Sequence, residues 1–231
     1  MERTNILRST FSFLSDLSEH NERDWFNENK HRYLEAHKHV IEFADSLLDA
    51  LKQHDEISTI SGKKSLMRIY RDVRFSKDKS PYKARFAGSF VRVKPQLRGG
   101  YFFSFKPGET IIGGGFYNPD PKDLKLIRDH LAQDDSPLRK VINSASFKKH
   151  FGELEGDRVK TAPKGFDKEH PSIDLLKYKS MYTFRSFSDA EVHDPAFLES
   201  ALDTFLAIRP FFDVMTDFLT TDLNGISLLD E

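Results

Sequence analysis

The chain has 231 residues, of which 38% are hydrophobic and 31% charged, and its 21 phenylalanines can build a large core. This composition is typical of a soluble globular protein and excludes a disordered chain. The absence of cysteine excludes disulfides, thiolate catalysis and cysteine-ligated zinc. No apolar run approaches the roughly 20 residues of a membrane span, and the N-terminal residues lack the apolar segment of a secretory signal. We therefore expect a cytoplasmic protein without a membrane partner.

Basic residues are distributed unevenly along the chain. The net charge is −1, yet residues 62–98 hold twelve lysines and arginines against two acidic residues, Asp72 and Asp78. Such a local excess can attract phosphate or carboxylate groups. It is equally compatible with internal ion pairs to the acidic remainder of the chain.

The first quarter of the sequence is helical in pattern. Thr10 is a candidate N-cap of a short helix, and Asn21 is a candidate N-cap of a long helix over residues 21–53. Apolar residues at helical spacing, from Phe26 to Leu51, form one stripe on this long helix.

Strand-like segments follow at residues 66–75, 84–93, 100–106 and 110–117. Pro107-Gly108 predicts a tight turn between the last two, and residues 178–187 form a further candidate strand. The short connections favour antiparallel pairing.

Three dipeptides of the later chain are typical helix starts: Asp120-Pro121, Ser136-Pro137 and Asp194-Pro195. Pro210 should kink or break the last helix. The pattern predicts a single α+β domain over residues 1–231. We expect a mainly antiparallel sheet of four or five strands with long N- and C-terminal helices packed on it.

The segment from Met67 to Lys83 carries the most unusual chemistry. As a strand it would place Arg68, Asp72 and Arg74 on one face, opposite an apolar face. Three interpretations remain open: an anion site in which Asp72 orients the arginines, a buried structural ion pair, and a solvated surface. On the first interpretation the candidate ligand-binding residues are Arg68, Arg71, Asp72, Arg74, Lys77, Lys79, Tyr82 and Lys83.

Residues 68–83 read Arg-x-x-Arg-Asp-x-Arg-Phe-Ser-x-Asp-Lys-Ser-Pro-Tyr-Lys, which resembles the signature of the domain-of-unknown-function family 2461, a set of uncharacterised, mainly bacterial proteins. Three other blocks match that family: residues 21–26 with Asn29, Lys30 and Tyr33, residues 113–117 with Pro119, and residues 163–167 with His170, Pro171, Leu175 and Leu176. The blocks span about residues 11–218, which makes the match specific. The resemblance implies no activity, cofactor or catalytic residue.

Other motifs are weaker. His31, Glu35 and His39 recur at helical spacing but oppose the apolar stripe, so we predict a solvated face and no metal site. The glycine run 113–115 lacks the spacing of a phosphate-binding loop and is typical of close backbone approach in a sheet. No sequence feature predicts a cofactor.

The sequence favours a domain that binds a phosphate-bearing or other anionic ligand on its basic strand and loop, with an anionic small molecule or nucleic acid as partner. One alternative is an enzyme acting on a phosphorylated or carboxylated substrate, with Asp72 or His170 as the acid–base group and the arginines as a clamp. Another is a structural or interaction domain that contains internal ion pairs only. The oligomeric state stays open.

Overall fold

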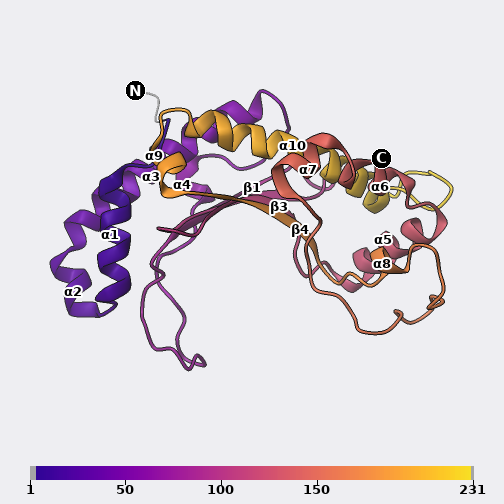
Figure 1. Ribbon diagram of the computed structural model, residues 1–231, viewed down its shortest axis with the longest axis horizontal. Coiled ribbons are helices and arrows are strands. Elements are labelled where there is room, and N and C mark those ends of the chain that lie inside the picture. Colours follow the sequence, from indigo (N-terminus) through magenta and orange to yellow (C-terminus); the bar gives the residue numbers. More distant parts are fainter. Residues whose placement is uncertain (1–3, 230–231) are drawn as a thin grey trace. The chain divides into compact units, whose positions relative to one another are not determined.

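The computed structural model describes residues 4–229. These residues form helices and one four-stranded antiparallel sheet (Figure 1). The predicted α+β class is confirmed. The strands follow one another in the order β1 (Phe86–Val91), β2 (Gly100–Phe105), β3 (Thr110–Phe116) and β4 (Met181–Phe187). Four of the five predicted strands are present, each with somewhat different ends.

The helices of the described residues are α1 (Arg8–Glu19), α2 (Arg23–Glu28), α3 (Lys30–Lys52), α4 (Gly62–Ser65), α5 (Pro121–Gln133), α6 (Ser136–Ile142), α7 (Ala145–Phe151), α8 (Ile173–Leu176), α9 (Asp189–His193) and α10 (Phe197–Thr220). Local chemistry explains several starts. The Asp120 carboxylate accepts from the Lys122 amide at 2.8 Å, and Pro121 opens α5 as predicted.

The chain forms two compact units. The first unit holds the described residues up to Phe90, together with Phe102–Ile112 and Ser186–Asp203. The second unit holds Val91–Tyr101, Gly113–Arg185 and the described residues from Thr204. The single domain over residues 1–231 stays a prediction, because compact units can belong to one folding domain.

The first unit is built around α1 and α3, whose apolar faces pack on each other. Phe13, Leu14, Val40 and Leu47 are fully buried. The start of α4 lies directly on α3, since a Cβ on Gly62 would stand 2.5 Å from the Asp45 backbone nitrogen. Only glycine permits that approach.

The predicted single helix over residues 21–53 is wrong: Asn29 separates α2 from α3. Asn21 is not a cap either, because its side-chain amide pairs with the backbone of Tyr82. Nδ2 donates to the Tyr82 carbonyl and Oδ1 accepts from the Tyr82 amide, both at 3.0 Å. Likewise Thr10 lies inside α1, which begins at Arg8.

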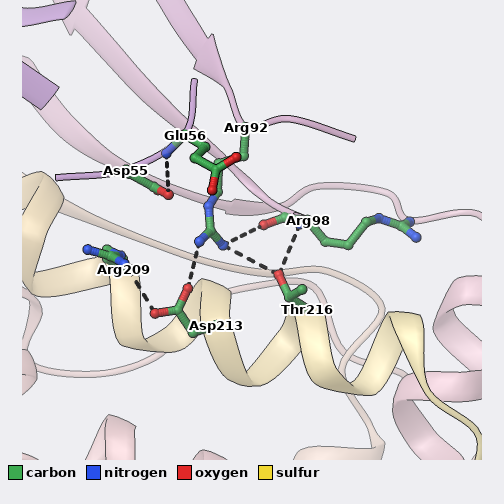
Figure 2. A network of polar contacts seen from close by, with 7 residues as sticks. All are labelled: Asp55, Glu56, Arg92, Arg98, Arg209, Asp213 and Thr216. Atoms are coloured by element: carbon green, nitrogen blue, oxygen red, sulfur yellow. Dashed lines mark hydrogen bonds and ion pairs between the residues drawn. The ribbon is translucent and has the colours of Figure 1, made fainter. Parts of the chain in front are cut away.

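In the second unit, a buried arginine ties the end of β1 to α10 (Figure 2). The Arg92 guanidinium donates to the Asp213 carboxylate at 2.6 Å, to the Arg98 carbonyl at 3.1 Å and to the Thr216 hydroxyl at 3.4 Å. Thr216 also accepts from the Arg98 amide at 2.9 Å. The helix runs on through Pro210, so the predicted break does not occur, and a kink at this proline stays a prediction.

The glycine run of β3 serves strand packing. A Cβ on Gly113 would lie 2.0 Å from the Thr183 carbonyl oxygen, and one on Gly114 would lie 2.3 Å from the Gly100 carbonyl oxygen. These distances are far below van der Waals contact, so the close approach of neighbouring strands requires glycine. This is the structural role that the sequence favoured over a phosphate cradle.

Candidate functional site

The segment predicted as the first strand, residues 66–75, forms no regular strand. It makes two isolated antiparallel bridges, Leu66 with Gly88 and Tyr70 with Tyr82. Backbone bonds from Arg71 to Pro81 (2.9 Å) and from Lys83 to Ile69 (2.7 Å) continue this loose pairing. Beyond it, residues 71–81 leave the sheet as a long connection before β1, here named the basic loop (Figure 1). The strand prediction failed because the loop satisfies several of its own amides: Asp72 accepts from Arg74, Asp78 accepts from Ser80, and the Val73 carbonyl accepts from Ser76.

Asp78 organises the base of this basic loop. One carboxylate oxygen accepts from the Ser80 amide at 2.9 Å and from the Ser80 hydroxyl at 2.7 Å, while the other pairs with Arg71. These bonds, from Ser80 first and Arg71 next, hold the pKa of Asp78 well below its usual range. Lys79 links the two sides of the loop, since its ammonium donates to the Val73 carbonyl at 3.0 Å.

Asp72 pairs with Arg74 on the loop surface. Its carboxylate accepts from Arg74 Nη2 at 2.7 Å and from Nε at 3.0 Å, and these hydrogen bonds lower the pKa of Asp72. Both side chains are exposed, so the interpretation of Asp72 as a buried acid is wrong. The predicted apolar face is also broken, because Ile69 is buried while Met67 is exposed.

A hollow of about 440 Å³ lies beside the base of the basic loop, entirely within the first unit. Its lining comes from three separate parts of the chain: Ser18 and Asn21, then Arg71, Asp78, Ser80, Tyr82, Lys83, Ala84 and Arg85, then Lys106 and Glu109. Apart from Tyr82 and Ala84, every lining residue is polar or charged. The Tyr82 ring stacks on Phe26 with centroids 4.0 Å apart, and its backbone is held by Asn21. This wall of the hollow is therefore fixed by packing.

Two of the four cations in the hollow are neutralised by neighbours. Arg71 pairs with Asp78, and Lys106 pairs with Glu109 at 2.5 Å across the turn between β2 and β3. Lys83 and Arg85 form no ion pair with any of residues 4–229. The hollow thus carries two cations without a protein counter-charge.

The hollow collects part of the predicted site. Arg71, Tyr82 and Lys83 line it, whereas Arg68, Asp72, Arg74, Lys77 and Lys79 are not among its lining residues. A ligand role for this second group stays a prediction. Sequence reasoning missed Arg85, Lys106 and Ser18, since only the tertiary pairing of distant segments brings them together.

His170, the other acid–base candidate, belongs to the second unit, whereas Asp72 belongs to the first. Its Nδ1 accepts from the Ser172 amide at 3.1 Å, and its carbonyl accepts from the Ile173 amide at 2.9 Å. These bonds are those of a turn that leads into α8. No cluster of His, Asp or Glu suited to a metal ion occurs within residues 4–229.

Fold and site together define an α+β protein with an antiparallel sheet and a cation-lined hollow. A family model described as conserved hypothetical protein (DUF2461) matches residues 9–214, so the chain belongs to that family. No curated protein and no solved structure matches the chain. Across residues 4–229, every helix is too short or too polar to cross a membrane.

Proposed function

We propose that the protein binds a small anionic ligand, a phosphate ester or carboxylate, in the hollow of the first unit. The observation that carries this proposal is the pair Lys83 and Arg85, which lines the hollow without a counter-charge from the described residues. Cations held without a partner favour an anion that can approach both.

The size and chemistry of the hollow support a small ligand. A volume of about 440 Å³ lies within the range of about 300–1,000 Å³ that is usual for small-molecule sites. Arg85 can offer two parallel donors to a phosphate or carboxylate, and Lys83 supplies a compact point charge. Ser18 adds a hydroxyl group that can orient a further oxygen, whereas the Ser80 hydroxyl already donates to Asp78.

Arg71 has a supporting role on this account. Its guanidinium is already paired with Asp78, whose lowered pKa keeps that carboxylate ionised at neutral pH. The pair holds the loop at the edge of the hollow and contributes little net charge to it.

A thermal-shift titration with inorganic phosphate, a sugar phosphate and a nucleoside monophosphate tests the proposal. A ligand that binds only the native state raises the unfolding temperature, so at least one of these anions should stabilise the wild type. Lys83→Ala and Arg85→Ala should each weaken the apparent affinity by about tenfold, the effect of losing one charge-assisted hydrogen bond.

Arg68→Ala provides the matched control. Arg68 is an exposed cation of the same segment, but it is not part of the hollow. The control should respond to anions as the wild type does. An equal loss in Arg68→Ala, or no stabilisation by any of the three anions, would refute binding in the hollow.

A further inference from the structure

Phe75 is the most exposed large apolar side chain among the described residues, with 96% of its surface open to solvent. It lies near the middle of the basic loop, away from Arg71 and Pro81, whose backbones pair at the two ends of the loop. Tyr70, directly before the loop, is also exposed at 55%, and its ring centroid lies 5.5 Å from that of Tyr82 in the hollow. Two accessible aromatic faces therefore accompany the cation-lined hollow.

Contacts within the basic loop leave the Phe75 side chain exposed. Arg74 is held by Asp72, the Ser76 amide donates to the Val73 carbonyl at 3.3 Å, and Lys79 reaches the same carbonyl at 3.0 Å. These bonds satisfy the loop on its own and place Phe75 outside it. No other part of the described chain covers the ring.

One cation lies over the exposed ring, and two more follow it in the sequence. The Arg74 guanidinium lies 5.9 Å from the Phe75 ring centroid, and the exposed residues Lys77 and Lys79 follow in the sequence. An accessible aromatic face beside several cations is the arrangement by which proteins hold unpaired nucleic-acid strands, with a base on the ring and phosphates on the cations.

We infer that the anionic ligand is single-stranded nucleic acid, with a phosphate in the hollow at Lys83 and Arg85 and an unpaired base stacked on Phe75. This inference rests on the proposed function and specifies its ligand class. Arg71, which lines the hollow, is four residues from Phe75, so their Cα atoms are at most about 14 Å apart. A few nucleotides can span that distance.

The chemistry of the loop favours a nucleic-acid strand over an anionic membrane surface. Phe75 is the one large, exposed apolar side chain among residues 71–81, and the Arg74 guanidinium lies over its ring. Inserting the ring into a bilayer would bring that guanidinium toward the apolar layer, and a single apolar anchor gives only marginal membrane binding. A base needs only the open face of the ring. Duplexes keep their base faces stacked internally, so an unpaired strand is required.

Fluorescence anisotropy with labelled 12-nucleotide oligo-dT and oligo-U tests the inference on the full chain. Phe75→Ala and Phe75→Leu should weaken binding by roughly 5- to 150-fold, the range expected for one stacked base. Phe75→Tyr and Phe75→Trp, which keep an aromatic face, should bind within about threefold of the wild type. Because Phe75 is exposed, all four variants should keep the wild-type unfolding temperature and its increase with inorganic phosphate.

The outcomes separate this inference from the proposed function. Phosphate stabilisation without oligonucleotide binding, or equal oligonucleotide affinity of the Leu and Tyr variants, overturns the inference and leaves anion binding in the hollow intact. Loss of phosphate stabilisation in Lys83→Ala alongside unchanged oligonucleotide binding would show that the strand's phosphates bind outside the hollow, which overturns the inference and leaves the proposed function intact. Binding to phosphatidylglycerol vesicles that Phe75→Leu retains and Phe75→Ala loses would show membrane insertion and also overturn the inference.

Discussion

At the scale of single residues, one carboxylate organises the edge of the hollow. Asp78 accepts two hydrogen bonds from Ser80 and pairs with Arg71. It thereby neutralises Arg71, one of the three arginines that the sequence placed among the ligand-binding residues. Lys83 and Arg85 remain as the cations that an incoming anion meets.

Asp78→Asn should lower stability at neutral pH and shift its pH dependence. Because the folded pKa of Asp78 lies below the unfolded value of about 3.9, its stabilising effect is fully present above that value. The effect is lost as the pH falls toward the lower folded pKa. Urea unfolding of both proteins between pH 7 and pH 3 should show a gap that is constant above about pH 5 and shrinks below about pH 4. A gap that widens in acid would contradict this assignment.

Asp213→Ala should destabilise the second unit. The substitution removes a carboxylate partner from the Arg92 guanidinium, whose side chain is 1% exposed. A buried cation that loses its carboxylate costs stability, here about 1–3 kcal/mol because Asp213 itself is half exposed. The control is the pair of the exposed Lys125 with the partly buried Asp129, and Lys125→Ala should cost at most about 0.5 kcal/mol. Equal unfolding midpoints for the two variants would show that the Arg92 network does not stabilise the fold.

At the scale of elements, the sequence predicted best where the signal is local. Asp120-Pro121 marks the start of α5 because the cap and the proline act within one turn. Polar and apolar side chains alternate over residues 66–75 as they do in a strand. A strand also needs a neighbouring segment that pairs with it over several residues. Here the backbone pairing ends at Arg71. Asparagine is a residue type typical of N-caps, but the Asn21 side chain hydrogen-bonds to the backbone of the distant Tyr82 and does not cap a helix.

Substituting Gly113 should disrupt the sheet within the second unit. A Cβ there would meet the Thr183 carbonyl at 2.0 Å, so Gly113→Ala should cost about 3 kcal/mol or more. Gly165→Ala is the control, because Gly165 has φ +92° but no atom within 4 Å of an added Cβ. Its cost should be limited to the backbone strain of about 1–2 kcal/mol. Thermal denaturation that ranks the two variants in the opposite order would contradict the close strand approach.

Leu47→Ala in α3 should cost about 2–5 kcal/mol, as expected for a side chain with no solvent exposure. Leu34, on the same helix, is 55% exposed, so Leu34→Ala should change the free energy of unfolding by less than about 1 kcal/mol. Chemical denaturation of the two variants compares a buried and an exposed leucine within one helix. Similar losses would mean that the buried face of α3 has been misassigned. The same cavity argument predicts a comparable cost for Phe205→Ala in α10.

At the scale of the whole molecule, the basic stretch of residues 62–98 divides between two roles. Arg92 and Arg98 form internal ion pairs with Asp213 and Asp123, as the structural interpretation of the charge expects. Lys83 and Arg85 line an open hollow, as the binding interpretation expects. This division cannot be predicted from a single sequence, because the acids that pair with Arg92 and Arg98 are far from them along the chain. The same limit kept Ser18 and Lys106 out of the predicted site, although their neighbours Asn21 and Pro107-Gly108 stood out locally.

Amide chemical-shift mapping by NMR during titration with inorganic phosphate tests binding in the hollow most directly. If phosphate binds in the hollow, the largest shifts should fall on Lys83, Arg85 and Lys106, and they should shrink with added salt because the attraction is partly Coulombic. Lys83→Ala should reduce them strongly at the same phosphate concentration, in line with an about tenfold weaker affinity. Shifts centred on Arg68 and Arg74, or no localised shifts at any phosphate concentration, would contradict the account.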